Sequence, residues 1–325
     1  MFELSANNAP EYLESRGLPT PRLVTELGGG VSNTVLLVEA AKDRFVLKQS
    51  LAKLRVEQDW FSDRRRVFRE SAAMRALAPH LPPGAVPGVL FEDPDNCLFA
   101  MSAAPEGTQT WKARLMAGEI RCEIARRVGE MLAAMIRMSW LNREYEAEFG
   151  DQTVFDQLRL DPYYRSTARR HPDLAPKFAA LMRESAARRV SLVHGDWSPK
   201  NFLVAGDCVV AIDFEVIHFG DPAFDAGFLL NHLALKSFFL PQSRPGLAAA
   251  ATQFWQAVMA GMPGDAKWIE GATVAHLGAL MLARIDGKSP AEYLRDEILR
   301  ERVRQFARDL IQHPPATVAQ VFERL

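Results

Sequence analysis

Residues 194–201 read HGDWSPKN, and residues 212–215 read IDFE. Apolar runs typical of buried strands adjoin both segments: SLV precedes HGDWSPKN, FLV follows it, and VVA leads into IDFE. A charged group beside a core costs free energy unless a neighbouring side chain, a metal ion or a substrate offsets its charge. The pattern therefore indicates a polar site at the ends of short strands.

The composition is that of an ordinary globular protein. The 325 residues are 48% hydrophobic and 24% charged, and this length suggests about two domains. The net charge is −1, which argues against a polyanion as partner, so we expect no nucleic acid binding. The three cysteines are isolated, no secretory signal precedes the fold, and polar residues interrupt the most apolar segment, so we expect a cytoplasmic protein without a membrane span.

The pattern of apolar residues changes along the chain. Residues 23–49 predict three strands separated by a Gly-rich turn and a polar turn, after a short helix in residues 1–20. A helix over 60–78 and a hairpin around the turn DPDN follow. Further on, helical patterns dominate at 112–148, 166–188, 223–240, 245–262, 265–284 and 290–312, with short strands at 191–194, 202–204 and 208–213. We expect an α+β protein with a β-rich N-terminal lobe, residues 1–104, and a mostly helical C-terminal lobe, residues 105–325.

The Gly-rich turn GGGVSN, residues 28–33, is a candidate phosphate-binding loop. Glycines let a backbone approach a ligand closely and present its N–H groups, so Gly29, Gly30, Ser32 and Asn33 are candidate nucleotide contacts. The segment is not a Walker A loop, because no Gly-Lys-Ser/Thr follows. A hairpin turn without a ligand explains it equally well.

Lys48, in FVLKQ, and Glu70, in the expected helix that follows, form a second candidate pair. A lysine in a strand is usually an edge or surface charge. Its functional interpretation is a phosphate-binding cation held by an acidic partner, for which Glu70 is suitably placed in the sequence.

Four residues in the opening segments carry oxygen ligands. Asp196 and Asn201 flank a loop between strands, and Asp213 and Glu215 follow the next strand. On extended backbone the spacing of two puts both of the latter carboxylates on one side. Carboxylate and amide oxygens suit Mg²⁺, and a free carboxylate at Asp196 could orient a hydroxyl group. Turn-forming residues at strand ends explain one or two of these residues, but not the whole order.

This order of parts resembles the protein kinases: a Gly-rich loop, a strand lysine, a helix glutamate, HxDxxxxN and an Asp after a strand. The form HGDWSPKN with IDFE and FGDPAFDAG, residues 219–227, is similar to the aminoglycoside phosphotransferase branch of small-molecule kinases, which includes choline kinases. The resemblance covers residues 25–235 and implies a two-lobed protein-kinase-like fold that binds ATP with Mg²⁺ and phosphorylates a small molecule.

The resemblance also implies roles for individual residues of the C-terminal lobe. Asp196 corresponds to the catalytic base, Asn201 and Asp213 to Mg²⁺ ligands, and Glu215 to a second acidic residue near the metal. Asp225 corresponds to an aspartate that braces the catalytic loop through backbone N–H groups. His194 corresponds to an orienting residue.

On the nucleotide side, Lys48 corresponds to the lysine that binds the phosphates and Glu70 to its helix partner. Met101 to Ala104 correspond to the hinge that meets adenine, so Met101 and Ala103 are candidate nucleotide contacts.

A finer resemblance links LKQSLAKLR, DPYYRST and MLARIDG to methylthioribose kinases and implies a small polyol or sugar as acceptor. Two segments depart from that group: the loop from Trp197 to Lys200, and Ala283-Arg284 in place of paired arginines. Trp197 and Arg284 are therefore candidate acceptor contacts, with Tyr163, Tyr164 and Arg165 as further candidates, although Trp197 could only pack and Arg284 could only pair with a nearby acid.

The expected function is ATP-dependent phosphoryl transfer to a hydroxyl of a small metabolite, with a methylthioribose-like sugar as the candidate acceptor, by a monomer or homodimer. The alternatives are an aminoglycoside or amino-alcohol kinase, a kinase-fold protein that binds nucleotide without turnover, and a metal-dependent phosphoesterase that uses the same carboxylates.

Overall fold

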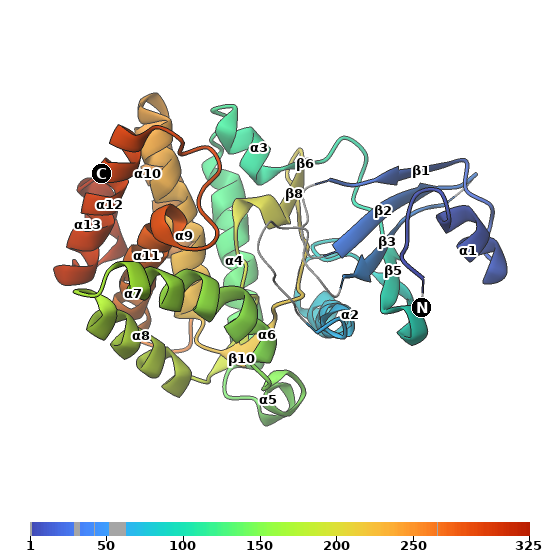
Figure 1. Ribbon diagram of the computed structural model, residues 1–325, viewed down its shortest axis with the longest axis horizontal. Coiled ribbons are helices and arrows are strands. Elements are labelled where there is room, and N and C mark those ends of the chain that lie inside the picture. Colours follow the sequence, from blue (N-terminus) through green and yellow to red (C-terminus); the bar gives the residue numbers. More distant parts are fainter. Residues whose placement is uncertain (1, 29–32, 42, 52–62, 265) are drawn as a thin grey trace. The chain divides into compact units, whose positions relative to one another are not determined.

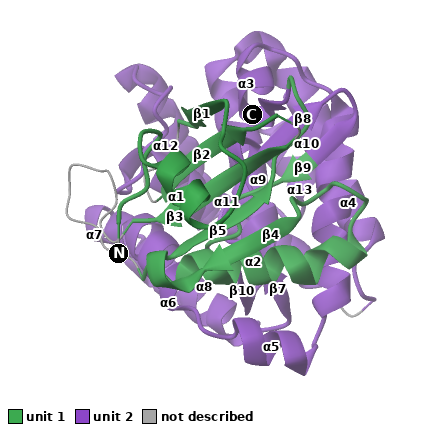
Figure 2. Ribbon diagram, turned by 90° about the vertical axis from the view of Figure 1, so that its right-hand side faces the viewer, with its two compact units in different colours: residues 1–107, 210–215 green, residues 108–209, 216–325 purple. Residues whose placement is uncertain are grey.

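The computed structural model of the chain describes residues 2–28, 33–41, 43–51, 63–264 and 266–325. Two compact units are distinguished: unit 1 comprises Met1–Gly107 and Val210–Glu215, and unit 2 comprises Thr108–Val209 and Val216–Leu325 (Figure 2). Unit 1 is built on a sheet and unit 2 is mainly helical, which confirms the α+β class and the expected order of its parts. The domain boundary at residues 104 and 105 stays a prediction; the compact units change at Gly107.

The strands of unit 1 form a five-stranded sheet in the order β1-β2-β3-β5-β4, with every neighbouring pair antiparallel. Their bounds are β1 Leu23–Glu26, β2 Asn33–Glu39, β3 Arg44–Ser50, β4 Val89–Asp93 and β5 Leu98–Ser102. Leu36 lies opposite Leu47, and Lys48 lies opposite Phe99. This register places Lys48 in the centre of the sheet rather than at an edge.

Two helices, α1 (Ala9–Ser15) and α2 (Arg66–Leu77), pack against this sheet (Figure 1). Leu13 of α1 joins Leu36 and Leu47 in a buried apolar core. Successive strand residues point to opposite faces, so Lys48 faces away from this core and meets Glu70 of α2. The alternation along β3 therefore separates an apolar face from a charged one.

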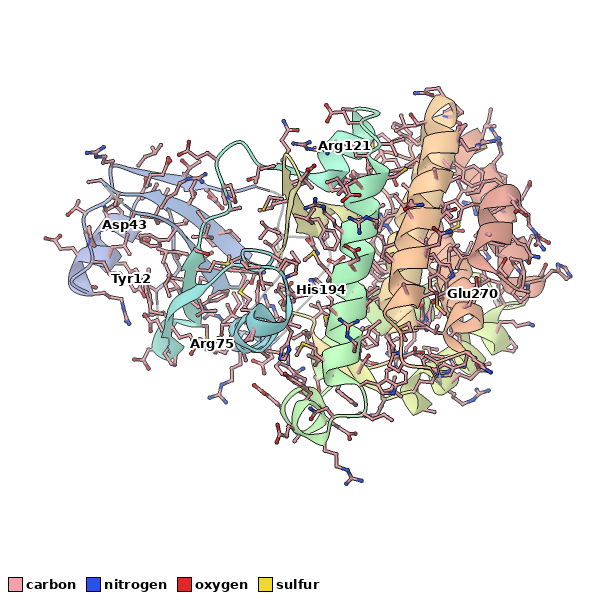
Figure 3. All side chains as sticks on the ribbon, turned by 180° about the vertical axis from the view of Figure 1, so that it is seen from behind. Tyr12, Asp43, Arg75, Arg121, His194 and Glu270 are labelled. Atoms are coloured by element: carbon pink, nitrogen blue, oxygen red, sulfur yellow. The ribbon has the colours of Figure 1, made fainter. Side chains whose placement is uncertain are left out.

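Helix α1 is shorter than the helix expected in residues 1–20. Pro10 fits at its start because the first helical N–H groups need no helical acceptor, and Gly17, with φ +70°, follows its end. Leu4 reaches the core from outside the helix. Tyr12, marked in Figure 3, donates its hydroxyl to Asp93 at 2.8 Å and ties α1 to the end of β4.

Helices make up most of unit 2, together with short strands. The helices are α3 Trp111–Met116, α4 Cys122–Ser139, α5 Arg143–Phe149, α6 Thr153–Phe155, α7 Ser166–Arg170, α8 Ala175–Ala187, α9 Ala223–Phe239, α10 Arg244–Ala260, α11 Ile269–Asp286, α12 Glu297–Gln312 and α13 Val318–Glu323. Strand β7 (Ser191–Val193) pairs with β10 (His218–Gly220), and β6 (Gln109–Thr110) pairs with β8 (Phe202–Ala205). The strand β9 (Cys208–Ala211) carries the chain from unit 2 into unit 1.

The helical pattern over 112–148 is three helices rather than one. Gly118, with φ +81°, lies between α3 and α4, and Leu141, with φ +51°, lies between α4 and α5; left-handed backbone cannot continue a helix. The sequence pattern also missed a π-helix, η3, at Asp156–Arg165. Pro162 lies inside it and has no N–H to donate, which disrupts the regular α-helical ladder that a periodic pattern detects.

Helices α9 and α11 are buried along most of their length, which explains why their sequences are apolar on all sides. The apolar segment at 226–240 belongs largely to α9. Among the described residues, no helix combines the length and hydropathy needed to cross a membrane.

Candidate functional site

Lys48 is the centre of a charge cluster in unit 1. Its Nζ lies 2.6 Å from Glu70 Oε2 and 2.7 Å from Asp213 Oδ1. Burial lowers the pKa of Lys48, but the negative charges of Asp213, Glu70 and Glu215 outweigh it and hold that pKa above its usual value. Burial raises the pKa of Glu70, against the attraction of Lys48. The lysine is therefore a fixed cation shared by two acidic side chains, and the expected Lys48–Glu70 pair is present.

Asp213 adopts left-handed backbone, with φ +70°, so the expectation that Asp213 to Glu215 are extended is wrong. The chain leaves β9 at Ala211, whose N–H donates to Ala85 O at 2.8 Å, and turns at once. Such a conformation costs free energy in a residue with a Cβ, although aspartate tolerates it better than most. The turn sets the direction of the Asp213 carboxylate toward Lys48.

Glu215 is engaged by two side chains of unit 1. Its Oε2 accepts from Arg66 Nε at 3.0 Å and from Asn33 Nδ2 at 2.9 Å. Arg66 is buried on α2, so it offsets the charge of Glu215 where water cannot. Asn33, expected near the nucleotide, is thus joined to the IDFE segment, and the metal-binding role of Glu215 stays a prediction.

The other nucleotide residues lie in or near the sheet. Met101 is buried within β5, and Ala103 directly follows that strand, where Arg44 donates to Ala104 O at 2.7 Å. Gly29, Gly30 and Ser32 lie outside the described residues. The roles of these five residues in nucleotide binding stay predictions.

In unit 2, Asp225 fixes the backbone of the HGD segment. Its Oδ2 accepts from His194 N at 2.6 Å and its Oδ1 from Gly195 N at 2.9 Å, which confirms the expected brace. Burial raises the pKa of Asp225 to about 7, although both backbone bonds favour its charged form. His194 in turn accepts the N–H of Asp196 on its Nδ1 at 3.1 Å. The brace and this bond together hold the peptide from which Asp196 projects.

Gly195 is required at its position for two reasons. Its φ is +78°, and a Cβ added there would lie 2.7 Å from Val216 Cγ1 and 3.0 Å from Val216 O. The pairing of β7 with β10 brings Val216, two residues before β10, close to the loop that follows β7. The loop is therefore packed too tightly for any other residue at position 195.

The Asp196 carboxylate is paired with two cations. Its Oδ2 lies 2.9 Å from Arg159 Nη2 and 2.8 Å from Lys200 Nζ. Burial raises the pKa of Asp196, but Lys200 and Arg159 outweigh burial and hold it well below its usual range. Asp196 is therefore an ionised hydrogen-bond acceptor over the whole neutral range.

The sequence did not indicate Arg159, which lies on the π-helix η3, where no regular period marks it. It also did not assign a role to Arg66. The sequence did not indicate a role for Lys200 either, although its position four residues after Asp196 is compatible with an ion pair. All three are cations that offset the carboxylates which the motif identified.

Asn201 has one free side-chain acceptor. Its Nδ2 donates to Asp196 O at 2.9 Å, and no described residue donates to its Oδ1. An amide oxygen fixed in this way fits a hard cation such as Mg²⁺. Within the described ranges, no three His, Cys, Asp or Glu side chains converge as a metal site. The metal-binding roles of Asn201 and Asp213 therefore stay predictions, as does that of Glu215.

The candidate acceptor residues have different environments. Trp197 is 1% exposed and packs on Phe202 and His194, with ring centroids 4.8 and 5.3 Å away. Arg284 Nη1 donates to Ser289 Oγ at 2.8 Å. The acceptor roles of Trp197 and Arg284 stay predictions.

The three further acceptor candidates, Tyr163, Tyr164 and Arg165, are adjacent in the chain but lie in different environments. Tyr164 is fully buried and bonds His276 Nδ1 at 2.6 Å, so its ring belongs to the core. Arg165 pairs with Asp156 at 2.7 Å on the surface. Tyr163, next to Tyr164, is also buried, but its hydroxyl lies 3.4 Å from Arg284 Nη1.

Comparison with known proteins agrees with the motifs. Residues 23–268 match the sequence model of the family described as "Phosphotransferase enzyme family". A methylthioribose kinase of Escherichia coli O45:K1 is 27% identical over 281 residues, which span 75% of this chain and 65% of the relative. A methylthioribose kinase of Geobacillus thermodenitrificans is 24% identical over 252 residues, which span 69% of this chain and 63% of the relative. The chain thus matches less than two thirds of either relative's length.

A likeness in fold also extends to a solved structure, "Amicoumacin kinase hAmiN in complex with AMP-PNP, Ca2+ and Ami". It covers 94% of both chains with a TM-score of 0.58 and 16% identity. The kinase-like fold and the resemblance to aminoglycoside phosphotransferases and methylthioribose kinases are thereby confirmed.

Gly195→Ala tests the packing of the HGD segment. We expect it to lower the free energy of unfolding by about 1–3 kcal/mol more than Gly206→Ala, since a clash adds to the cost of left-handed backbone. Gly206 is the matched control, because its φ is +55° and nothing lies within 4 Å of an added Cβ. Urea unfolding of both variants measures the difference, and equal costs would show that Val216 yields without penalty.

Asp196→Asn tests the pairing of Asp196 through the pH dependence of stability. The folded pKa is depressed, so the stabilisation is present above the unfolded pKa of about 3.9 and is lost as pH falls through the folded pKa. We expect the advantage of wild type over the variant in free energy of unfolding to shrink as pH falls below about 4. Chemical unfolding between about pH 2 and 5, where folded Asp225 stays protonated in both proteins, measures this change, and an advantage that stays the same across that range contradicts the assignment.

Proposed function

Because the chain belongs to the phosphotransferase enzyme family, we propose that it transfers the γ-phosphate of ATP to a hydroxyl group of a small metabolite. The observation that carries the proposal is Asp196: an ionised carboxylate, held by two cations, on a loop whose backbone Asp225 fixes. A phosphoryl transfer site needs little more from a side chain than accurate orientation of the attacking hydroxyl.

Asp196 orients the acceptor hydroxyl and accepts its proton as the new O–P bond forms and the bond from Pγ to ADP breaks. A strongly depressed pKa makes Asp196 a weak base, so orientation is its main contribution and proton transfer follows late. Arg159 and Lys200 hold the carboxylate in one direction.

Lys48 binds the phosphates on the nucleotide side, kept charged and directed by Glu70 and Asp213. Asp213 and Asn201 supply a carboxylate and an amide oxygen for Mg²⁺. When bound, Mg²⁺ supplies positive charge against the phosphate oxygens. Glu215, already paired with Arg66, steadies the segment that carries Asp213.

The names of the sequence relatives support a class of acceptor. Those named above are methylthioribose kinases, which supports a small polyol, with a methylthioribose-like sugar as the first candidate.

Asp196→Asn also tests the activity. We expect kcat to fall about 10²–10⁴-fold while ATP affinity changes little, since the variant loses the charge that orients the hydroxyl. A coupled ADP-release assay with Mg²⁺ and a panel of pentoses, deoxypentoses, amino alcohols, homoserine and aminoglycosides identifies the acceptor and measures kcat. Asp207→Asn, an exposed aspartate of unit 2, is the control and should retain turnover. Wild-type transfer by Asp196→Asn excludes the proposed role.

Asp213→Ala tests the metal assignment. We expect it to remove the Mg²⁺ dependence of ATP binding, because the variant lacks the carboxylate that contributes most charge to the metal. Calorimetric titration of ATP with and without Mg²⁺ compares the variant with wild type. Unchanged Mg²⁺-dependent affinity contradicts the assignment and favours a metal held by other residues.

A further inference from the structure

Among the described residues of unit 2, a group of cationic and phenolic side chains gathers around a single carboxylate, that of Glu292. The other members come from α3, α9, α11 and the segment after α11: Lys112, His232, Lys236, Arg284 and Tyr293. Helices α9 and α11 pack together in unit 2 (Figure 1).

Lys236 is fully buried on α9, and its polar contacts are poor. Its Nζ donates only to His232 O, at 3.4 Å, among the described residues, and lies 5.3 Å from the centroid of the Tyr293 ring. The Tyr293 hydroxyl and Arg284 Nε are both buried and have no hydrogen-bond partner among the described residues. Buried donors without acceptors are costly, and such a group in one place indicates that an acceptor binds there.

The charges of the cluster do not balance. Three cations, Lys112, Lys236 and Arg284, face one carboxylate, that of Glu292. Glu292 pairs with Lys112 and lies 3.9 Å from Arg284 Nη2, and its side chain is 56% exposed. Burial, and then Lys112 and Arg284, lower the pKa of Lys236 to about 7. An apolar side chain at position 236 would avoid this cost, so the lysine indicates a function rather than packing.

Contacts connect this cluster to Asp196. Arg284 Nη1 lies 3.4 Å from the Tyr163 hydroxyl, the Arg159 guanidinium lies 5.9 Å from the Tyr163 ring centroid, and Arg159 pairs with Asp196. Burial lowers the pKa of His232. The positive charges of Lys236 and Arg284 lower that pKa further, and the negative charge of Asp196 opposes them, so all three charges act on the His232 ring.

Resting on the proposed function, we propose that the acceptor is a polyhydroxy acid of the aldonate type, whose carboxylate binds Lys236 and Arg284 while Asp196 orients one of its hydroxyls. Carboxylates form strong charge-assisted hydrogen bonds with both cations, and Tyr293 supplies a further donor. The proposed acceptor differs from a neutral sugar in its carboxylate, the group that unit 2 would recognise.

Calorimetric binding of matched acids and neutral compounds tests the inference, with D-ribonate against D-ribose and D-gluconate against D-glucitol, each in the presence of AMP-PNP and Mg²⁺. We expect each acid to bind at least about tenfold more tightly than its neutral counterpart, since a buried charge pair is worth at least that factor. Lys236→Met should abolish this preference and leave affinity for the neutral compound and for AMP-PNP within about twofold. Lys177→Met, an exposed lysine on α8, is the matched control and should keep the preference.

Arg284→Gln is the second variant, should Lys236→Met fail to fold, and it should show the same selective loss. Equal or absent binding of the acids overturns the inference, and so does a preference that survives both substitutions. The ADP-release assay separates this failure from that of the proposed function: turnover of neutral sugars with no preference for acids overturns only the anionic acceptor, whereas acid binding without ADP release from any acceptor overturns only the kinase activity.

Discussion

The hydrogen bonds that the backbone N–H groups of His194 and Gly195 donate to Asp225 are the constraint on which the geometry of the HGD segment depends. A carboxylate buried at the start of α9 needs donors, and the two adjacent N–H groups that bond it belong to a turn in which Gly195 has φ +78°. That geometry in turn aims Asp196 at Arg159. Asp225, on a different element, thus determines where the Asp196 carboxylate points.

The same principle of paired burial governs unit 1. Lys48 is shared by Glu70 and Asp213, and Arg66 offsets Glu215. Each of these pairs is buried or half-buried, so removing one member leaves an uncompensated charge at high cost. The cluster around Lys236 is the exception, since its cations outnumber its acids, and this contrast within one protein gives the inferred anion site its physical basis.

Sequence patterns predicted those elements whose periodicity was regular. The strands β1 to β5 and the helices α9 to α12 were expected near their observed positions, because alternation and 3.6-residue periods reflect burial directly. The π-helix η3 escaped, and with it Arg159, since neither a regular period nor a motif marks them. The turn at Asp213 escaped because aspartate is compatible with both extended and left-handed backbone.

The sequence by itself determined the family, because the segments HGDWSPKN and IDFE carry its motif residues in a specific order. It also determined the order of a β-rich part before a helical part. Only the tertiary structure decided which cations offset the carboxylates and where cations outnumber acids. Arg66 and Arg159 are far in sequence from the carboxylates with which they pair, and Lys236 is far in sequence from the charges that surround it. Charge compensation in a core depends on distances between elements, and no local pattern records those distances.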